Sequence, residues 1–310
     1  MNPLFQATLS KVFSKPAPFQ SFSIEEILEW GKKELEFLGI QEAAAEAEKL
    51  LREVSGCSRP ALYLKAKQPV EAKHLKQYRQ WIRLRKKRIP SAYISGGAYF
   101  WNEYLEVREG CLIPRPETEV LVERFIDVAG FSKEKSFRFL DLGCGSGAIG
   151  IALLRYFQNA RATFLDISEA ALQITGKNLA RYGLLARSEI LRSDLFEAAR
   201  NVSKVNPKKW DAIVSNPPYL SRRDWESVEP EIFFEPRQAL DGGEDGLVFY
   251  DRILREAAEF LNPGGWLAVE VGQGQAASVA ERMQRNSFKE IRIFQDYSKI
   301  ERVLMGQANC

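Results

Sequence analysis

The sequence predicts an α/β protein: a doubly wound sheet of seven strands, preceded by a small helical bundle and a connecting β-hairpin. Three observations support this prediction. Short apolar runs alternate with helical patterns from residue 137 onward, as a mostly parallel sheet requires. A glycine-rich turn joins the first of these runs to a helix, and polar residues follow several of the later runs where each ends. Before residue 90 the apolar residues recur with a helical period.

Residues 1–90 are predicted to form a helical domain. Ser23 and Glu26 fit a capping box at the start of a helix, and further helical patterns cover residues 41–54 and 71–88. Eleven Lys or Arg residues stand between residues 59 and 88 against a single acid, although the whole chain carries a net charge of only +3. This basic strip is either a solvated helix face or a docking surface for an acidic or nucleic-acid-associated partner.

Residues 91–114 are predicted to be a linker, and residues 115–310 the sheet domain. Aromatic and apolar residues on both sides of Asn102-Glu103 predict a hairpin that acts as a spacer. The expected strands are residues 137–140, 163–165, 190–191, 212–214, 266–271, 291–294 and 302–305. The expected helices of this domain are residues 120–128, ahead of the first strand, and residues 149–157, 247–261 and 275–285 between strands.

The glycine-rich turn is Asp141-Leu142-Gly143-Cys144-Gly145-Ser146-Gly147. A strand, a glycine turn and a helix bring backbone N–H groups close to a ligand at the helix N-terminus. The third glycine comes one residue too early for the dinucleotide fingerprint, and no phosphate-binding P-loop signature is present. Cys144 is interpreted as a small side chain in a tight turn rather than as a nucleophile.

Acidic residues follow the next two strands. Asp166 stands about twenty residues past the glycine turn, where an acid can accept hydrogen bonds from both hydroxyls of a ribose. Asp194 is placed to accept from an adenine amine, with Leu195 or Phe196 against the ring. The predicted ligand is therefore a nucleoside. The simpler alternative for both acids is a helix cap or a turn residue.

Asn216-Pro217-Pro218-Tyr219 follows the fourth strand. Each proline forces the residue before it into extended geometry, so this segment predicts a rigid cup with hydrogen-bond acceptors and no N–H donor at its prolines. The Asn216 side-chain oxygen and the Pro217 carbonyl could each accept one hydrogen of a planar NH2 group, while Tyr219 covers its flat face. The target would be an amide or an exocyclic base amine. A proline-rich connection without function is the simpler alternative.

Together these residues resemble the class I S-adenosylmethionine methyltransferases, and within them the HemK/PrmC-type glutamine methyltransferases of peptide chain release factors. Further stretches similar to that family are residues 90–96, Phe100-Trp101, residues 112–119, residues 234–240 and residues 242–247. The resemblance covers the chain from about residue 90 to its end. Its most specific element is Arg115-Pro116-Glu117-Thr118-Glu119.

The resemblance implies a Rossmann-like methyltransferase sheet whose last strand is antiparallel. It also implies S-adenosylmethionine as cofactor, S-adenosylhomocysteine as product, and the glutamine of the Gly-Gly-Gln loop in class-1 release factors as substrate. Arg115 and Glu117 are expected to help bind this substrate. The simpler account of that stretch is an ordinary helix start, with Pro116 at the first position and acids in the first turn.

Composition agrees with such an enzyme. With 45% hydrophobic and 27% charged residues, the chain is an ordinary globular protein, and no apolar run approaches the length of a membrane span. The N-terminus lacks a basic region followed by an apolar core, so we expect a cytoplasmic protein. Cys57, Cys111, Cys144 and Cys310 have no metal-site or disulfide-scaffold spacing. The single histidine, His74, stands in a basic helical stretch, which argues against a catalytic triad. No metal site is implied, and nothing requires more than a monomer.

Three other functions remain open at this level. A ribosomal-protein glutamine methyltransferase would use identical chemistry. A DNA adenine methyltransferase would use the same Asn-Pro-Pro-Tyr cup for a flipped base, but the segment before residue 90 is small for a target-recognition domain. Direct nucleic-acid binding is therefore not expected. A non-catalytic scaffold would be expected to carry degraded cofactor motifs, and these motifs are intact.

Overall fold

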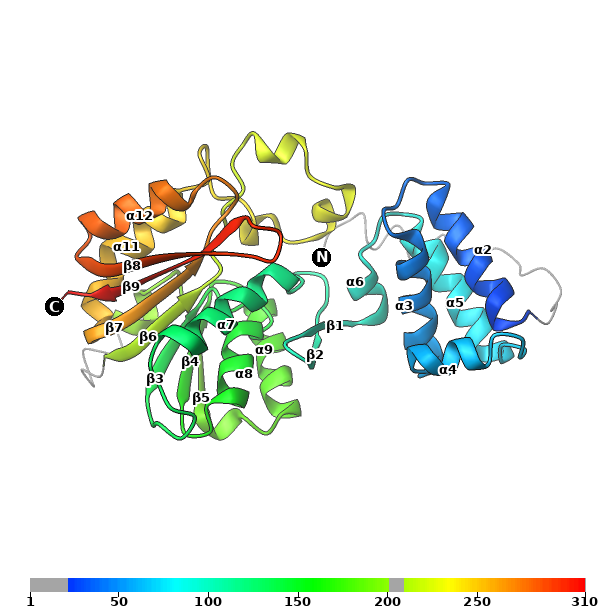
Figure 1. Cartoon of the computed structure of the whole chain (residues 1–310), viewed down its shortest axis with the longest axis horizontal. Coiled ribbons are helices and arrows are strands. Elements are labelled where there is room, and N and C mark those ends of the chain that lie inside the picture. The colour runs from blue at the N-terminus through cyan, green and yellow to red at the C-terminus, as the bar shows by residue number, and fades with distance from the viewer. Residues whose placement is uncertain (1–21, 201–208, 310) are drawn as a thin grey trace. The chain divides into compact units, whose positions relative to one another are not determined.

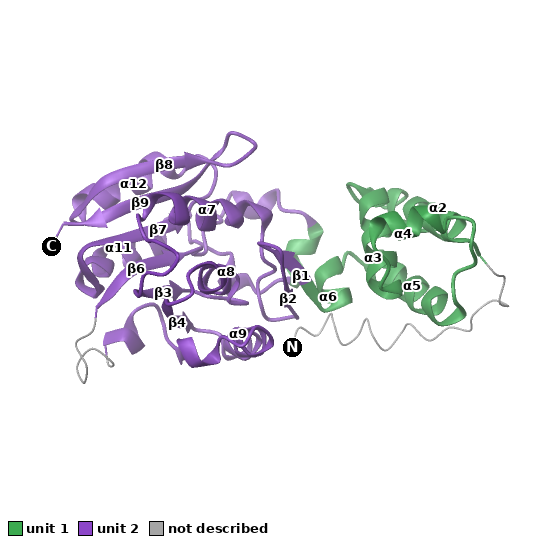
Figure 2. Cartoon of the chain, turned by 60° about the horizontal axis from the view of Figure 1, so that its bottom comes forward, with its two compact units in different colours: residues 1–97, 230–234 green, residues 98–229, 235–310 purple. Residues whose placement is uncertain are grey.

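The computed structural model describes residues 22–200 and 209–309. The chain divides into two compact units, coloured separately in Figure 2. The helical unit comprises the chain up to Gly97 together with Pro230–Phe234, and the sheet unit comprises Ala98–Glu229 and the chain from Glu235 onward. The predicted linker is thus shared between the two units, and a short segment from the second half of the chain belongs to the helical unit.

The helical unit is built from amphipathic helices around an apolar core. They are α2 (Ile24–Glu36), α3 (Ala43–Ser55), α4 (Arg59–Leu64), α5 (Ala72–Arg85) and α6 (Ser91–Ser95). The predicted capping box is confirmed: Ser23 Oγ accepts the Glu26 N–H, and the Glu26 carboxylate accepts the Ser23 N–H at 2.8 Å. The core includes the fully buried side chains of Ile27, Leu50 and Tyr78.

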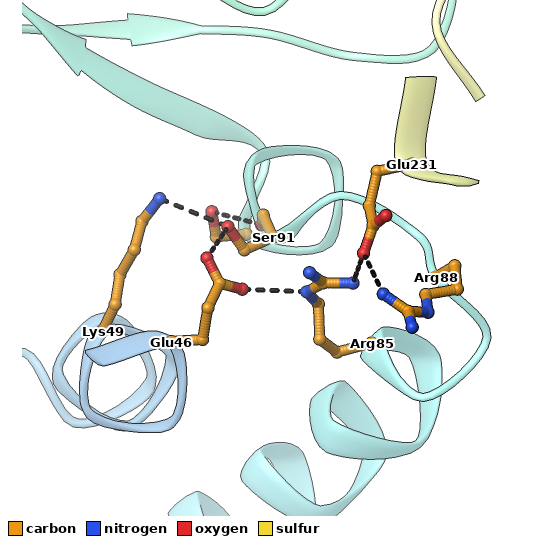
Figure 3. A network of polar contacts seen from close by, with 7 residues as sticks. Glu46, Lys49, Arg85, Arg88, Ser91 and Glu231 are labelled. Carbon is orange, nitrogen blue, oxygen red and sulfur yellow. Dashed lines mark hydrogen bonds and ion pairs between the residues drawn. The ribbon is translucent and has the colours of Figure 1, made fainter. Parts of the chain in front are cut away.

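At least six of the eleven cations in the predicted basic strip have a carboxylate partner within the helical unit. Arg85 lies between the carboxylates of Glu46 and Glu231 (Figure 3). It is only 6% exposed, and its Nε is 2.8 Å from Glu46 and its Nη1 2.6 Å from Glu231. Arg88 also contacts Glu231, at 3.2 Å. Other cations of the strip with carboxylate partners are Arg59, Lys67, Lys73 and Lys86. The strip is therefore not a continuous free basic surface.

The sheet unit contains the seven predicted strands. They are β3 (Arg138–Leu142), β4 (Arg161–Asp166), β5 (Ser188–Arg192), β6 (Trp210–Ser215), β7 (Leu261–Glu270), β8 (Phe288–Gln295) and β9 (Glu301–Ala308). Their order in the sheet is β5-β4-β3-β6-β7-β9-β8, and the pairs from β5 to β7 are all parallel. β9 pairs antiparallel with both neighbours, as the resemblance implies.

Helices cover both faces of this sheet (Figure 1). The helices α7 (Glu119–Val128), α8 (Ala148–Tyr156) and α9 (Glu169–Arg181) share a core with one face, and α11 (Val248–Phe260) and α12 (Ala276–Arg285) share a core with the other. Alternate residues of each strand enter opposite cores, as Phe139 and Leu140 do in β3. Residues 262–265, predicted as a loop, fall inside β7, opposite a register irregularity in β6.

The predicted hairpin is formed by β1 (Gly97–Phe100) and β2 (Glu103–Glu106). Trp101 and Asn102 both have positive φ, which matches the twist of a two-residue hairpin turn. Phe100 and Leu105 are buried in the same core as α7 and α8. The hairpin is therefore packed against the sheet unit rather than acting as a free spacer.

Candidate active site

A cavity of about 200 Å³ lies at the carboxyl ends of the parallel strands. The glycine turn, the two strand-end acids and the Asn-Pro-Pro-Tyr segment all contribute to its wall, whereas residues 115–119 do not. The predicted site residues that line it are Gly143, Gly145, Asp166, Asp194, Leu195, Asn216, Pro217 and Pro218. Parallel strands place their carboxyl ends at one edge, which explains why segments up to 75 positions apart converge here.

The glycine turn after β3 has a backbone that favours glycine. Gly143 and Gly145 both lie in the left-handed region, with φ of 70° and 55°. The Gly143 N–H donates to the Leu165 carbonyl at 2.8 Å, and the Gly145 N–H donates to Asp166 Oδ2 at 2.8 Å. The turn is thus fastened to the end of β4, with its backbone exposed to the cavity.

The remaining residues of this turn support it from behind. Gly147, with φ of 80°, precedes α8, and the Ser146 carbonyl accepts a hydrogen bond from Asn178 at 2.9 Å. Neither residue lines the cavity, and neither does Cys144. Burial raises the pKa of the Cys144 thiol well above its ordinary value, which disfavours a reactive thiolate. The interpretation of Cys144 as a small structural side chain agrees with this position.

Asp141 is buried beneath the turn rather than exposed in the cavity. Its Oδ2 accepts the Gly150 N–H at 2.9 Å, and its Oδ1 has no hydrogen-bond partner among the described residues. Burial raises the pKa of Asp141 to about 7. A Cβ at Gly150 would lie 2.7 Å from the Asp141 carboxylate and 2.3 Å from the Phe164 ring, so glycine is required there. The unpartnered oxygen leaves Asp141 able to accept a hydrogen bond from a bound group.

The two acids after β4 and β5 differ in their partners. Asp166 lines the cavity while Oδ1 accepts the Ser168 N–H at 2.8 Å, and burial raises its pKa. Asp194 forms an ion pair of 2.8 Å with Arg252, which also lines the cavity. No sequence pattern pointed to Arg252. The Arg252 guanidinium contacts Oδ1 of Asp194, the carboxylate that was expected to accept a hydrogen bond from an adenine amine.

The structure separates the two apolar candidates beside Asp194. Leu195 lines the cavity with a left-handed backbone, at φ of 47°. Phe196 is fully buried in the core, where its ring stacks on Phe260 with centroids 4.8 Å apart. Phe196 is therefore part of the core and not of the cavity wall, because consecutive residues in this turn face different sides.

Asn216 is held by a residue that sequence reasoning did not select. Its Nδ2 donates to Thr118 Oγ1 at 3.1 Å, and the Thr118 hydroxyl donates to Glu270 Oε2 at 2.5 Å. The Tyr219 hydroxyl lies 3.4 Å from Glu270 Oε1, and Tyr219 lines a second small cavity that shares Asn216 and includes Arg115. The Asn-Pro-Pro-Tyr cup thus has a polar support behind it.

The Arg115–Glu119 stretch contributes through Arg115 and Thr118. Arg115 forms an ion pair with the buried Glu235, which also accepts the Ile113 N–H at 2.9 Å. Glu117, expected to help bind substrate, is exposed, whereas the next residue, Thr118, is 4% exposed. Thr118 and Glu235 both lie in stretches already noted for their family resemblance. Glu270 is the last residue of β7, although the predicted strand ran on to Val271, and an acid near the end of a buried strand was the available signal.

Glycines after residue 240 allow close packing against the Asn-Pro-Pro-Tyr segment. A Cβ on Gly246 would lie 2.4 Å from the Tyr219 carbonyl oxygen, and one on Gly242 would lie 2.8 Å from the Tyr219 Cα. The same carbonyl accepts a hydrogen bond from Gln275 at 2.9 Å. This packing fixes the chain direction immediately after Tyr219.

In the described part of the chain, no helix is both long and apolar enough to cross a membrane. The residues in 22–200 and 209–309 also contain no group of three or more His, Cys, Asp or Glu side chains able to hold a metal ion. Cys57, Cys111 and Cys144 are free thiols, and Cys310 lies outside the described residues.

Comparisons with known proteins agree with the two-unit organisation. Residues 26–96 match the family described as the PrmC N-terminal domain, and residues 117–249 match the methyltransferase small domain. A protein of Geobacter sulfurreducens named release factor glutamine methyltransferase is 37% identical over 287 residues, which cover 92% of this chain and 97% of that protein. A protein of the same name from Gloeobacter violaceus is 37% identical over 267 residues, covering 86% and 91%.

Among solved structures, the hMettl16 catalytic domain in complex with MAT2A 3′UTR hairpin 6 has a TM-score of 0.53 and covers 75% of this chain and 81% of that one. At 14% sequence identity this likeness supports the methyltransferase fold alone. The curated relatives align over nearly their whole length, including both units. The chain belongs to the release factor glutamine methyltransferase family.

Proposed function

We propose that this protein transfers the methyl group of S-adenosylmethionine to the side-chain amide nitrogen of the glutamine in the Gly-Gly-Gln loop of class-1 release factors. One observation carries the proposal: Asn216 lines the cavity, and its NH2 group donates a hydrogen bond to Thr118 Oγ1 at 3.1 Å. Its oxygen is left to accept from a substrate NH2 group. The names of the curated relatives support the choice of a release factor glutamine.

The cavity wall fits the cofactor. The Gly143–Gly145 backbone is bare, since a Cβ at either glycine would meet no atom within 4 Å, and it can lie against a flat or extended ligand. Asp166 would accept hydrogen bonds from the ribose hydroxyls, and Leu195 would contact the adenine. The unpartnered Asp141 oxygen adds a buried acceptor close to the turn. When bound, S-adenosylmethionine supplies a methyl group on a positively charged sulfur and leaves as S-adenosylhomocysteine.

The reaction is difficult because an amide nitrogen shares its lone pair with the carbonyl. The barrier of roughly 18–20 kcal/mol to rotation about such a bond measures this sharing. In the proposed mechanism the Asn216 oxygen and the Pro217 carbonyl accept the two hydrogens of the glutamine NH2 group. They orient the nitrogen towards the methyl group and favour a tetrahedral geometry. Methylation turns the nitrogen into a strong acid, so its proton can leave to Asn216, a carbonyl or water without a histidine.

Pro218 and Tyr219 shape the rest of the cup in this proposal. Tyr219 would cover one flat face of the amide, and Arg115 would contribute to the substrate side of the smaller cavity. Glu117 is exposed and could contact the substrate only from the rim. The helical unit is proposed to dock the body of the release factor. Because release factors act on ribosomes, we also propose that the protein works in the cytoplasm. We propose that it is a monomer.

Transfer of labelled methyl from S-adenosylmethionine tests the proposal. The substrates would be a purified release factor, the same factor with its loop glutamine changed to alanine, a ribosomal-protein extract and duplex DNA. Label in the intact release factor alone is the expected result. Label in a ribosomal protein or in DNA instead would overturn the assigned substrate, and no label in any of them would overturn the enzymatic proposal.

A further inference from the structure

A buried chain of hydrogen bonds runs from Asn216 into the sheet unit. Asn216 Nδ2 donates to Thr118 Oγ1 at 3.1 Å, and the Thr118 hydroxyl donates to Glu270 Oε2 at 2.5 Å. Thr118 is 4% exposed and Glu270 is 1% exposed. The two residues come from the short helix η1 (Pro116–Thr118) and from the end of β7. Neither lines the cavity. Thr118 therefore acts on a bound substrate through Asn216, whereas Glu270 acts through Thr118 and Asn216 and also contacts the Tyr219 hydroxyl, 3.4 Å from its Oε1.

The charge of Glu270 decides the direction of each bond in this chain. An ionised carboxylate can only accept hydrogen bonds, so the Thr118 hydroxyl donates its one hydrogen to Glu270. Towards Asn216 it can then act only as an acceptor. Asn216 must then turn its NH2 group towards Thr118 and its oxygen towards the cavity. A protonated Glu270 can itself donate to Thr118, and the Thr118 hydrogen is then free to point at Asn216.

The second arrangement would present the wrong group to the substrate. The oxygen and nitrogen of an amide have nearly the same shape, so packing alone does not choose between the two orientations of Asn216. With the oxygen turned to Thr118, the Asn216 NH2 group would face the glutamine NH2 group, donor against donor. The hydrogen-bond acceptor on which the proposed reaction depends would be lost.

We propose, on the basis of the function given above, that Thr118 and Glu270 are positioning residues that set the polarity of the Asn216 amide. The ionised Glu270 carboxylate, acting through the Thr118 hydroxyl, keeps the Asn216 oxygen directed at the substrate nitrogen. The enzyme therefore holds the glutamine amide in its reactive orientation only when Glu270 is ionised.

The surroundings of Glu270 make this control sensitive to pH. Burial raises the pKa of Glu270 to about 7, and the negative charge of Glu117 acts in the same direction. The hydrogen bond from Thr118, the cation of Arg302 on β9 and the Tyr219 hydroxyl oppose this rise. Tyr250 of α11 donates to the backbone carbonyl of Glu270 at 2.8 Å and carries no charge at neutral pH. Turnover should therefore rise with pH through the neutral range.

Three variants test the inference. Thr118→Val removes the hydroxyl at nearly constant volume, and Thr118→Ser retains it. Thr163→Val is a matched control, since Thr163 is also 4% exposed but its hydroxyl contacts the Trp210 indole in the core. We expect Thr118→Val to lower kcat at least about tenfold, because Asn216 would lose the hydrogen bond that directs its oxygen at the reacting nitrogen. Thr118→Ser and Thr163→Val should retain most of the wild-type kcat.

Calorimetric titration with S-adenosylhomocysteine would show whether the cofactor site is intact. Its Kd should change less than about twofold in Thr118→Val, because Thr118 does not line the cavity. A Thr118→Val enzyme as active as wild type would overturn the inference. So would a Thr118→Ser enzyme as impaired as Thr118→Val, because the loss would then reflect packing rather than the hydroxyl.

Glu270→Gln and a spectroscopic titration complete the test. Carbon-13 NMR of protein labelled at its glutamate carboxyl carbons should show one signal that titrates near pH 7 and is absent in Glu270→Gln. The rise of kcat with pH should be absent in that variant too. An unchanged pH profile in Glu270→Gln would contradict the inference. If wild type methylates no release factor, the proposed function fails. The NMR titration and the side-chain amide signals of Asn216, followed across the same pH range, still test the control of its orientation.

Discussion

The guanidinium of Arg85 lies 2.6 Å from the carboxylate of Glu231, although the two residues are 146 positions apart in the chain. Arg85 is almost completely buried, and its Nε contacts Glu46 on the other side (Figure 3). Glu231 belongs to Pro230–Phe234, which lies in the sequence between the Asn-Pro-Pro-Tyr cup and α11. This ion pair secures that segment within the helical unit.

Replacing Glu231 with glutamine should therefore loosen the segment. Glu231→Gln removes one of two carboxylates from a buried cation, and we expect a loss of about 1.5–3 kcal/mol in the free energy of unfolding. Amide hydrogen exchange at residues 230–234 should become faster. Glu34→Gln is the control, since Glu34 pairs with Lys86 at a half-exposed position and should cost less than about 1 kcal/mol. Equal costs in the two variants would contradict the role given to Glu231.

The two strand-end polar residues should separate chemistry from cofactor binding. Asn216→Ala should lower kcat by about 100-fold, because it removes an acceptor from the reacting nitrogen, and leave the Kd for S-adenosylhomocysteine nearly unchanged. Asp166→Ala should weaken that Kd by at least about tenfold, because it removes the acceptor for the ribose and the partner of the Gly145 N–H. Comparable losses of cofactor affinity in both variants would count against the assignment.

Gly246 should be intolerant of a side chain. Gly246→Ala would place a methyl group 2.4 Å from the Tyr219 carbonyl oxygen, and we expect a loss of about 2–4 kcal/mol in the free energy of unfolding, together with lower turnover. Gly130→Ala is the control: its φ of 70° is close to the 77° of Gly246, but an added Cβ would meet nothing within 4 Å. It should cost only about 1–2 kcal/mol, measured by urea unfolding, and leave kcat unchanged.

Asp141 should make stability depend on pH. Burial raises its pKa to about 7 from an ordinary value near 3.8, so between these two values the folded protein binds more protons than the unfolded chain. The free energy of unfolding of the cofactor-free protein must then fall as pH rises through this window. Asp141→Asn cannot titrate and should lose this contribution, which is on the order of 3 kcal/mol. If the free energy of unfolding had the same pH dependence in wild type and Asp141→Asn from pH 4 to pH 7, Asp141 would not be buried in the protonated form.

Local patterns predicted most of the fold. The Ser23–Glu26 capping box, the hairpin, whose turn lies one residue before the predicted Asn102-Glu103, and the alternation of strands with helices all depend on neighbours in the chain. The strand-end positions of Asp166 and Asn216 then follow from the parallel topology, which gathers carboxyl ends at one edge. For this reason several cavity-lining residues, among them Gly143, Asp166 and Asn216, could be predicted before any contact was known, whereas Arg252 could not.

The contacts that orient these side chains depend on the folded chain. Thr118 and Asn216 are hydrogen-bonded although they are 98 positions apart, and Asp194 with Arg252 and Arg85 with Glu231 form ion pairs between distant segments. Phe196 packs in the core, whereas its neighbour Leu195 lines the cavity. Sequence periodicity specifies backbone conformation and which face of an element is apolar. It does not specify which distant polar groups become partners, because that choice depends on how the packed elements bring buried donors and acceptors within hydrogen-bonding distance.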